Sequence, residues 1–171
     1  ARAAPAARAP GAADTTTAST GPAGCTDAAA GYYVPGVGAA AQTACSAGTY
    51  QPSTGQTSCT DAAAGYYVDT AAATSQTACS AGTYNPNTGS TSSAACTDAS
   101  AGYYVASVGS ASQTACSAGT YQPSTGQTSC TDASAGYYVD TTAATSQIAC
   151  SAGTYNPNTG STSSAACTDA S

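Results

Sequence analysis

Cysteine is the residue type whose spacing in this chain indicates chemistry. The chain has nine cysteines, and the intervals from each one to the next run 20, 14, 20 and 17 before the same order begins again. Cys25, Cys96 and Cys167 are therefore equivalent positions in a tandem array. Regularly spaced cysteines form disulfides or bind zinc. Zinc is not expected, because the chain has no His and no two cysteines with the close spacing of tetrahedral zinc sites.

The apolar composition also favours disulfides. The chain contains no Leu, Phe, Met or Trp, and its larger aliphatic residues are six Val and Ile148. Apolar burial therefore falls short of a chain-entropy cost of roughly 1 to 2 kcal/mol per residue. A disulfide that closes a loop of about 15 residues contributes roughly 3 kcal/mol. Because disulfides persist in oxidising surroundings, we expect an extracellular or cell-surface protein.

The charged residues exclude several classes of function. Eight Asp, Arg2 and Arg8 are the only charged side chains, for a net charge of −6. Without His, Glu or Lys, the usual nucleophile and base arrangements cannot form, so we expect no enzyme, no catalytic residues and no cofactor. A nucleic-acid partner is not expected, because phosphate binding relies on Lys and Arg. Membrane insertion is not expected either, since no apolar stretch approaches roughly 20 residues.

The cysteine array divides the chain into an arm and four repeat units. The arm is rich in Ala, Pro and Thr and contains no cysteine. The units form two pairs, 25–95 and 96–166, because the turn before each new unit alternates between QPSTGQTS and NPNTGSTSSAA. No initiator Met or signal-peptide core is present, as in a mature or partial chain. The arm, the units and the start of a further repeat or closing segment are residues 1–24, 25–58, 59–95, 96–129, 130–166 and 167–171.

Only short elements are available to position the cysteines. Strong β preference is confined to the GYYV and GTY segments of each unit, and Pro and Gly mark the turns between them. No segment has a sustained helical period. The predicted fold is a small disulfide-rich repeat array of short β-hairpins and loops with little or no helix. It is expected to be elongated and rod-like, because each unit contacts only its neighbours.

Two pairing schemes fit the cysteine spacing. Their shorter and longer loops differ by only about 0.3 kcal/mol in closure entropy, so this term leaves both open. The short-loop scheme pairs Cys45 with Cys59, Cys79 with Cys96, Cys116 with Cys130 and Cys150 with Cys167, and leaves Cys25. The long-loop scheme pairs Cys25 with Cys45, Cys59 with Cys79, Cys96 with Cys116 and Cys130 with Cys150, and leaves Cys167.

The segment CSAGTYQPSTGQTSC resembles the ephrin-receptor-like and TNF-receptor-like repeats of extracellular surface proteins. In those repeats a Cys-Pro-x-Gly-Thr-Tyr opening leads through a Gly-containing turn to a closing Cys. The resemblance covers residues 25–167 and implies the short-loop scheme, with Cys25 unpaired or bonded between subunits. This sequence differs from the family pattern at the unit junctions, where Ala62 takes the place of a cysteine.

Tyr and Asp recur in every unit. We expect one Tyr of each pair, such as Tyr32 and Tyr33, to pack on a disulfide. The other would face out, in a row of rings able to stack on sugars or on a neighbouring subunit. The Asp after each Cys-Thr, such as Asp27, is interpreted as a turn former that bonds its own backbone. A metal site is not expected, because these Asp are isolated.

Ser and Thr runs near Pro predict O-linked glycans, while no Asn lies in an N-glycosylation sequon. The turn prolines are candidates for hydroxylation and glycosylation by analogy of composition. The candidate sites are Thr15, Thr16, Thr17, Ser90, Thr91, Ser92, Ser93, Pro52, Pro86, Pro123 and Pro157.

These features predict an extracellular structural repeat protein, an O-glycosylated building block that self-associates into a surface fibre or filament. The alternative is a cell-surface adhesion or glycan- or protein-binding array that uses its Tyr rows. An ice-binding repeat protein is a minor alternative, since ice binding needs Thr in a flat, closely spaced lattice. The alternation of shorter and longer units disfavours such a lattice.

Overall fold

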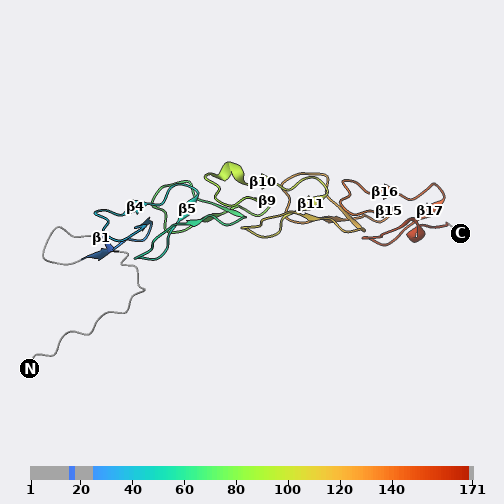
Figure 1. The fold of residues 1–171 in the computed structure, drawn as a ribbon. Coiled ribbons are helices and arrows are strands. Elements are labelled where there is room, and N and C mark those ends of the chain that lie inside the picture. Colours follow the sequence, from blue (N-terminus) through green and yellow to red (C-terminus); the bar gives the residue numbers. More distant parts are fainter. Residues whose placement is uncertain (1–15, 18–24, 170–171) are drawn as a thin grey trace, which may run out of the picture.

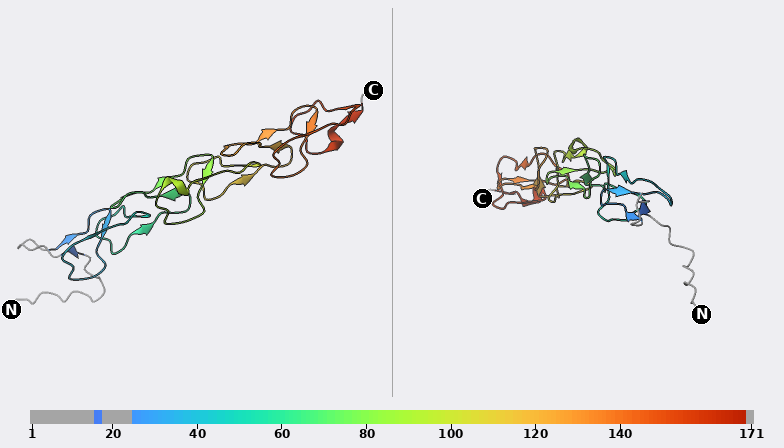
Figure 2. Two further views of the ribbon diagram at one scale, coloured as in Figure 1. Left: turned by 90° about the horizontal axis from the view of Figure 1, so that it is seen from above. Right: turned by 90° about the vertical axis from the view of Figure 1, so that its left-hand side faces the viewer.

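The computed structural model describes residues 25–169 and the backbone of Thr16–Thr17. The remainder of the predicted arm 1–24, and residues 170 and 171 of the last segment, lie outside the described residues. The units follow one another along the axis of an elongated rod (Figures 1 and 2). The predicted elongated, disulfide-rich repeat array is confirmed.

All the described strands are two residues long and pair in antiparallel hairpins. In one kind of hairpin, the Tyr pair of a unit lies against the segment before its next cysteine. These hairpins are β3 (Tyr32–Tyr33) with β4 (Thr43–Ala44), β7 (Tyr66–Tyr67) with β8 (Thr77–Ala78), β11 (Tyr103–Tyr104) with β12 (Thr114–Ala115), and β15 (Tyr137–Tyr138) with β16 (Ile148–Ala149).

In the second kind of hairpin, a Thr-Tyr strand pairs with the Thr-Asp strand that follows the closing cysteine. These hairpins are β5 (Thr49–Tyr50) with β6 (Thr60–Asp61), β9 (Thr83–Tyr84) with β10 (Thr97–Asp98), β13 (Thr120–Tyr121) with β14 (Thr131–Asp132), and β17 (Thr154–Tyr155) with β18 (Thr168–Asp169). At the start of the array, β1 (Thr16–Thr17) pairs with β2 (Thr26–Asp27) in the same register.

Helical structure in the described chain is limited to two 3₁₀ turns, η1 (Ser93–Ala95) and η2 (Ser164–Ala166). Both lie in the longer version of the turn. Their residues are therefore the extra length that separates a longer unit from a shorter one. No helix in the part of the chain that the structure describes is long and apolar enough to cross a bilayer.

The interior is a row of small side chains along the rod. The Val after each Tyr pair is at most 2% exposed, as are Cys45, Cys79 and Cys116. Ala62, which takes the place of a family cysteine, is 0% exposed, so close packing occupies that position. The buried Val and Ala of the four units are Val34, Val68, Val105, Val139, Ala28, Ala62, Ala99 and Ala133.

Each of the first three unit boundaries is crossed by a hairpin of the second kind and by four further backbone hydrogen bonds. One of the four extends the hairpin, as the N–H of Ala62 does by donating to Gly48 O at 2.8 Å, and the other three join the bodies of the two units. At the first junction, the N–H of Gly48 donates to Val68 O at 2.8 Å, and the N–H of Gln51 donates to Ala73 O at 3.0 Å. In return, the N–H of Ala72 donates to Cys45 O at 2.8 Å. The equivalent donors and acceptors are Gly82 and Val105, Asn85 and Ser110, and Gly109 and Cys79 at the second junction, then Gly119 and Val139, Gln122 and Ala144, and Ala143 and Cys116 at the third.

Candidate functional site

Disulfides cross every unit boundary in the described array. Each bond joins the middle of one unit to the first residue of the next, with Cα–Cα distances of 5.6 to 5.8 Å. Cys25 is free and exposed. The pairs are those that the family resemblance implied, namely Cys45–Cys59, Cys79–Cys96, Cys116–Cys130 and Cys150–Cys167.

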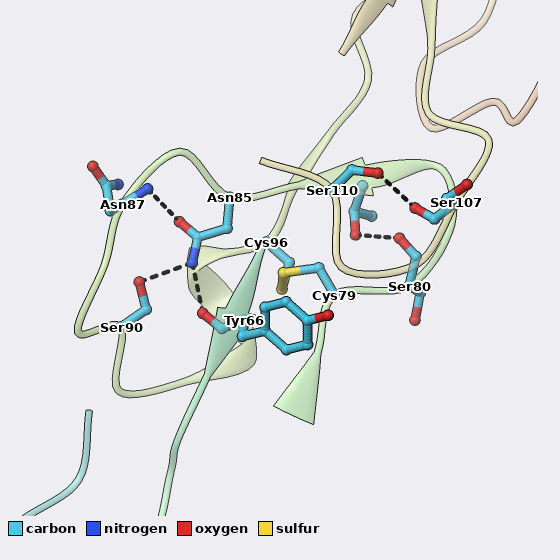
Figure 3. The surroundings of a disulfide bond; sticks show 10 residues. Tyr66, Cys79, Ser80, Asn85, Asn87, Ser90, Cys96, Ser107 and Ser110 are labelled. Carbon is cyan, nitrogen blue, oxygen red and sulfur yellow. Dashed lines mark hydrogen bonds between the residues drawn. A yellow bond between two sulfur atoms is a disulfide. The ribbon is translucent and has the colours of Figure 1, made fainter. Parts of the chain in front are cut away.

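A buried amide fixes the loop that each disulfide closes. The Nδ2 group of Asn85 donates to Tyr66 O at 3.0 Å and to Ser90 Oγ at 2.8 Å (Figure 3). Its Oδ1 accepts from the N–H of Asn87 at 3.1 Å, and the side chain is fully buried. In the shorter turn, Gln51 takes this place and donates to Ser58 O at 2.9 Å. Sequence reasoning missed these amides, although an Asn or Gln follows every Gly-Thr-Tyr.

A second amide closes the other half of each unit. The Oε1 atom of Gln42 accepts a hydrogen bond from the N–H of Ala29 at 2.7 Å. The bond orients the segment after the first cysteine relative to the segment before the second. Gln76, Gln113 and Gln147 accept the equivalent bond in the later units.

Three hollows of similar composition lie beside the disulfides. Each combines a Tyr ring, disulfide sulfur and three Ser or Thr side chains, and none is lined by a charged residue. The first, of about 270 Å³, is lined by Tyr33, Ser46, Thr49, Ser58 and Cys59. The second, of about 230 Å³, is lined by Tyr67, Ala78, Cys79, Ser80, Thr83, Ser93 and Cys96. The third, of about 270 Å³, is lined by Tyr104, Ser117, Thr120, Ser129 and Cys130.

The Tyr pairs are arranged differently from the expectation of one ring inside and one outside. Both members are half-buried in each of the first three units. The second member lines a hollow beside a disulfide, as Tyr33 does. The hydroxyl of a first member, Tyr66, lies against Gly109 of the following unit, where an added Cβ would be 2.7 Å from Oη. Thus the ring expected to face out is half covered.

The Asp residues after Cys-Thr do not form the expected turns. Each is the second residue of a strand and is exposed, and within residues 25–169 its carboxylate makes no hydrogen bond. Strand pairing already uses the local backbone, so the side chain does not close a turn. The carboxyl group of Asp27 instead lies beside Gly55, where an added Cβ would be 3.4 Å from Cγ.

Most candidate glycosylation sites that the structure describes are accessible. Thr91, Ser92 and Ser93 are exposed, as are the four turn prolines Pro52, Pro86, Pro123 and Pro157. Ser90 differs, because it is only 9% exposed and its Oγ is bonded to Asn85. The Ser90 hydroxyl is therefore not accessible to a glycan in this fold. Thr15 lies outside the described residues, and the side chains of Thr16 and Thr17 are likewise not described.

Comparison with known proteins identifies the repeats. The family model described as tyrosine-protein kinase ephrin type A/B receptor-like matches residues 31–79 and 102–150, which together make up more than half of the chain. The two matches begin at Gly31 and Gly102, equivalent positions of the first and second repeat pairs. A search of curated proteins found no match. The matches and the disulfides indicate an extracellular or secreted cysteine-rich module, and the chain belongs to the family of ephrin-receptor-like repeats.

Proposed function

We propose that this chain is a structural rod, a glycan-coated building block of an extracellular fibre that grows by adding repeat units end to end. The observation that carries the proposal is the junction. The same hairpin, the same four further backbone hydrogen bonds and one disulfide recur at each of the first three unit boundaries. An interface of this kind can be repeated each time a unit is added, as in solenoid proteins. The proposal assigns no catalysis, in keeping with a sequence that lacks His, Glu and Lys.

The last described unit presents an uncovered copy of this junction. Gly153 is exposed, whereas its equivalent Gly48 is buried beneath the next unit. The N–H groups of Gly153 and Asn156 have no hydrogen-bond partner among the described residues, whereas the equivalent groups of earlier units donate across a junction. Tyr155 is 55% exposed and Ile148 is 44% exposed on the same unit. This face accepts a further unit, either in the same chain or from a second copy.

The first unit carries the complementary backbone groups. Val34 O and Ala39 O correspond to the acceptors Val68 O and Ala73 O, and the N–H of Gly38 corresponds to the donor of Ala72. Two donors and an acceptor on one face therefore match two acceptors and a donor on the other. Residues 167–169 already occupy the place that residues 25–27 hold in the first unit. A second copy consequently docks through residues 31–58 of its first unit. Residues 167–169 of one copy and residues 25–27 of the other compete for the same place, so one of these two segments is displaced.

The assembly is tested by sedimentation and electron microscopy of the chain over a range of concentrations. Tyr155→Asp should shorten or abolish the rods, because it places a charge on the uncovered face. Val108→Asp is the matched control, since Val108 is also exposed, at 66%, but lies on an internal unit. It should leave rod length unchanged. Single-length monomers at every concentration, or equal effects of the two variants, would contradict the proposal.

The glycan coat is tested separately by mass. Peptides of residues 25–169 from native material should exceed their polypeptide masses by whole sugar residues. Peptide mapping should place the sugars on Thr91, Ser92, Ser93 or the turn prolines, and not on Ser90. If all of these peptides have the mass of the bare polypeptide, the glycan coat is contradicted and only the rod remains.

A further inference from the structure

We propose that the three hollows beside the disulfides are binding sites for neutral sugar rings, so that the rod presents a pyranose site at each of its first three junctions. The sites go beyond the structural role above and do not depend on end-to-end assembly, since each hollow is complete within one chain. Tyr33, Ser46 and Thr49 of the first hollow have equivalents in the other two, whereas Ser93 of η1 lines the second hollow in place of Ser58.

The ring that forms one wall is held in place by the fold. Tyr33 lies on β3 and pairs with Thr43 of β4, two residues before Cys45. The facing wall comes from β5 and from the residues before β6, which the Cys45–Cys59 bond ties to the same position. The face of a Tyr ring is electron-rich, and the C–H bonds on one face of a pyranose are weakly electropositive, so the two surfaces attract each other.

The hydroxyl groups of the hollow have unused hydrogen-bonding capacity. Thr49 Oγ1 donates to Ser46 O at 2.8 Å, which leaves its lone pairs available as acceptors. The Oγ atoms of Ser46 and Ser58 and the Oη atom of Tyr33 make no hydrogen bond within the described residues. Each of these groups is both a donor and an acceptor, as is each hydroxyl of a sugar. The lining is therefore suited to a ligand that presents several hydroxyls around an apolar face.

Charge and size narrow the class of ligand. No charged side chain lines any of the three hollows, and the net charge of the chain is −6. The negative potential of the chain disfavours anionic sugars, such as uronic acids or sulfated sugars. It does not disfavour a neutral sugar. The volumes of 230 to 270 Å³ are smaller than the roughly 300 to 1,000 Å³ of sites for drug-sized ligands. They suit one sugar ring rather than a folded oligosaccharide.

Repetition makes weak sites useful. A shallow hollow with a few hydroxyls is expected to bind one sugar with a Kd in the millimolar range, about −4 kcal/mol. A polysaccharide with regularly spaced rings engages several hollows at once, and linkage of this kind raises affinity by roughly 10²- to 10⁴-fold. The ligand comes either from the O-glycans of a neighbouring rod or from a foreign polysaccharide, and both sources present the same neutral ring.

The test uses the whole chain, made free of sugar with its disulfides formed, and NMR titration with methyl β-D-galactopyranoside, methyl α-D-mannopyranoside and methyl β-D-xylopyranoside. At least one sugar should shift the ring resonances of Tyr33, Tyr67 and Tyr104. Replacing all three with Ala should weaken binding by at least about tenfold, because the stacking surface is lost. The matched control is Thr70→Ala with Thr141→Ala, two exposed hydroxyls outside the hollows, and it should bind normally.

A second variant keeps the test decisive if loss of the rings unfolds the rod. Ser46→Ala with Ser80→Ala and Ser117→Ala removes exposed hydroxyls that make no hydrogen bond through their side chains, so the fold should be retained. Binding should weaken by about three- to tenfold, as expected for one lost hydrogen bond per site. The proposal is overturned if no sugar shifts these rings at about 100 mM, far above a millimolar Kd. It is also overturned if the serine variant binds as tightly as the parent.

Two further measurements identify the source of the sugar. If the ligand is a glycan of a neighbouring rod, the ring resonances of native material should change when its glycans are removed enzymatically. If it is a foreign polysaccharide, sugar-free chain should bind an immobilised neutral polysaccharide, and deglycosylation of native material should leave the rings unchanged. Either result supports the sites, whereas no change in both measurements contradicts them.

Discussion

The carbonyl oxygen of Ala72 lies directly against Gly31, in the space that a Cβ on that glycine would occupy. Gly31 also has a φ of +83°, in the left-handed region. The glycine before the Tyr pair is therefore required twice, by its own backbone and by the backbone of the next unit. The same close approach joins Gly65 to Gly109 and Gly102 to Ala143.

The chain contains a matched pair of positions that separates these two requirements. Gly102 and Gly136 share a φ of +84°, but Ala143 O lies against Gly102, whereas nothing lies within 4 Å of a Cβ built on Gly136. Gly136→Ala should lower the free energy of unfolding by about 1 to 2 kcal/mol, the usual penalty for an L-residue in the left-handed region. Gly102→Ala should cost more than about 3 kcal/mol, because the junction must also separate.

Native-state hydrogen exchange of the Val105 and Val139 amides measures both effects. Because a repeat array need not unfold in one step, local exchange is more informative than a single midpoint. Gly102→Ala should accelerate exchange on both sides of the third junction, and Gly136→Ala should do so less. Equal acceleration by the two substitutions would show that the close approach contributes nothing.

Substitution in the opposite direction should stabilise the rod. Ala72 and Ala143 both have a φ of +55°, whereas the equivalent residues of the odd units are Gly38 and Gly109. Ala72→Gly relieves the left-handed strain of about 1 to 2 kcal/mol but adds entropy to the unfolded chain, so the net gain should be about 0.5 to 1 kcal/mol. Urea denaturation measures this gain in the free energy of unfolding. Ala73→Gly is the control, since Ala73 has no positive φ, and it should destabilise. A loss of stability in Ala72→Gly would contradict the interpretation of strain.

The sequence predicted the architecture because the architecture is periodic. The spacing from Cys25 to Cys167 defined the units, and the absence of Leu and Phe required cross-links. The pairing was implied only by resemblance, because closure entropy separates the shorter from the longer loops by only about 0.3 kcal/mol. What composition could not supply was the relation between neighbouring units. The cover of Gly31 by Ala72 depends on how two units stack, and no residue pattern within one unit encodes it.

The candidate site was predicted in part for the same reason. The sequence predicts that one Tyr of each pair packs beside a disulfide, and Tyr33 does line a hollow beside Cys59. The alternation rule for strands then suggested that the other ring faces solvent. The strands are only two residues long and the next unit packs over them, so both rings are half-buried. Turn propensity places Asp27 in a turn, but strand pairing with β1 overrides that preference.

The disulfide scheme makes a prediction about covalent structure and stability. Peptide mapping without reduction should find Cys45 linked to Cys59, with Cys25 as the one cysteine that reacts with a thiol reagent. Replacing Cys45 and Cys59 together with Ala should cost about 3 kcal/mol, since a loop of about 15 residues is opened. Cys25→Ser should leave stability unchanged, because this cysteine is exposed and free. A peptide that links Cys25 to Cys45 would contradict the scheme.

The buried amide of Asn85 should matter more to stability than any other polar side chain in its turn. Asn85→Ala leaves Tyr66 O and Ser90 Oγ without their donor and the N–H of Asn87 without its acceptor. Unsatisfied buried groups cost about 1 to 3 kcal/mol each, so we expect a loss of at least about 2 kcal/mol. Asn87→Ala keeps the backbone N–H that Asn85 accepts and removes only an exposed side chain, so it should be neutral. Urea denaturation compares the two variants, and limited proteolysis between η1 and β9 shows where the first opens. If Asn85→Ala and Asn87→Ala are equally stable, water replaces the hydrogen bonds of the Asn85 amide and the prediction is contradicted. The turn would then be held by the Cys79–Cys96 bond alone.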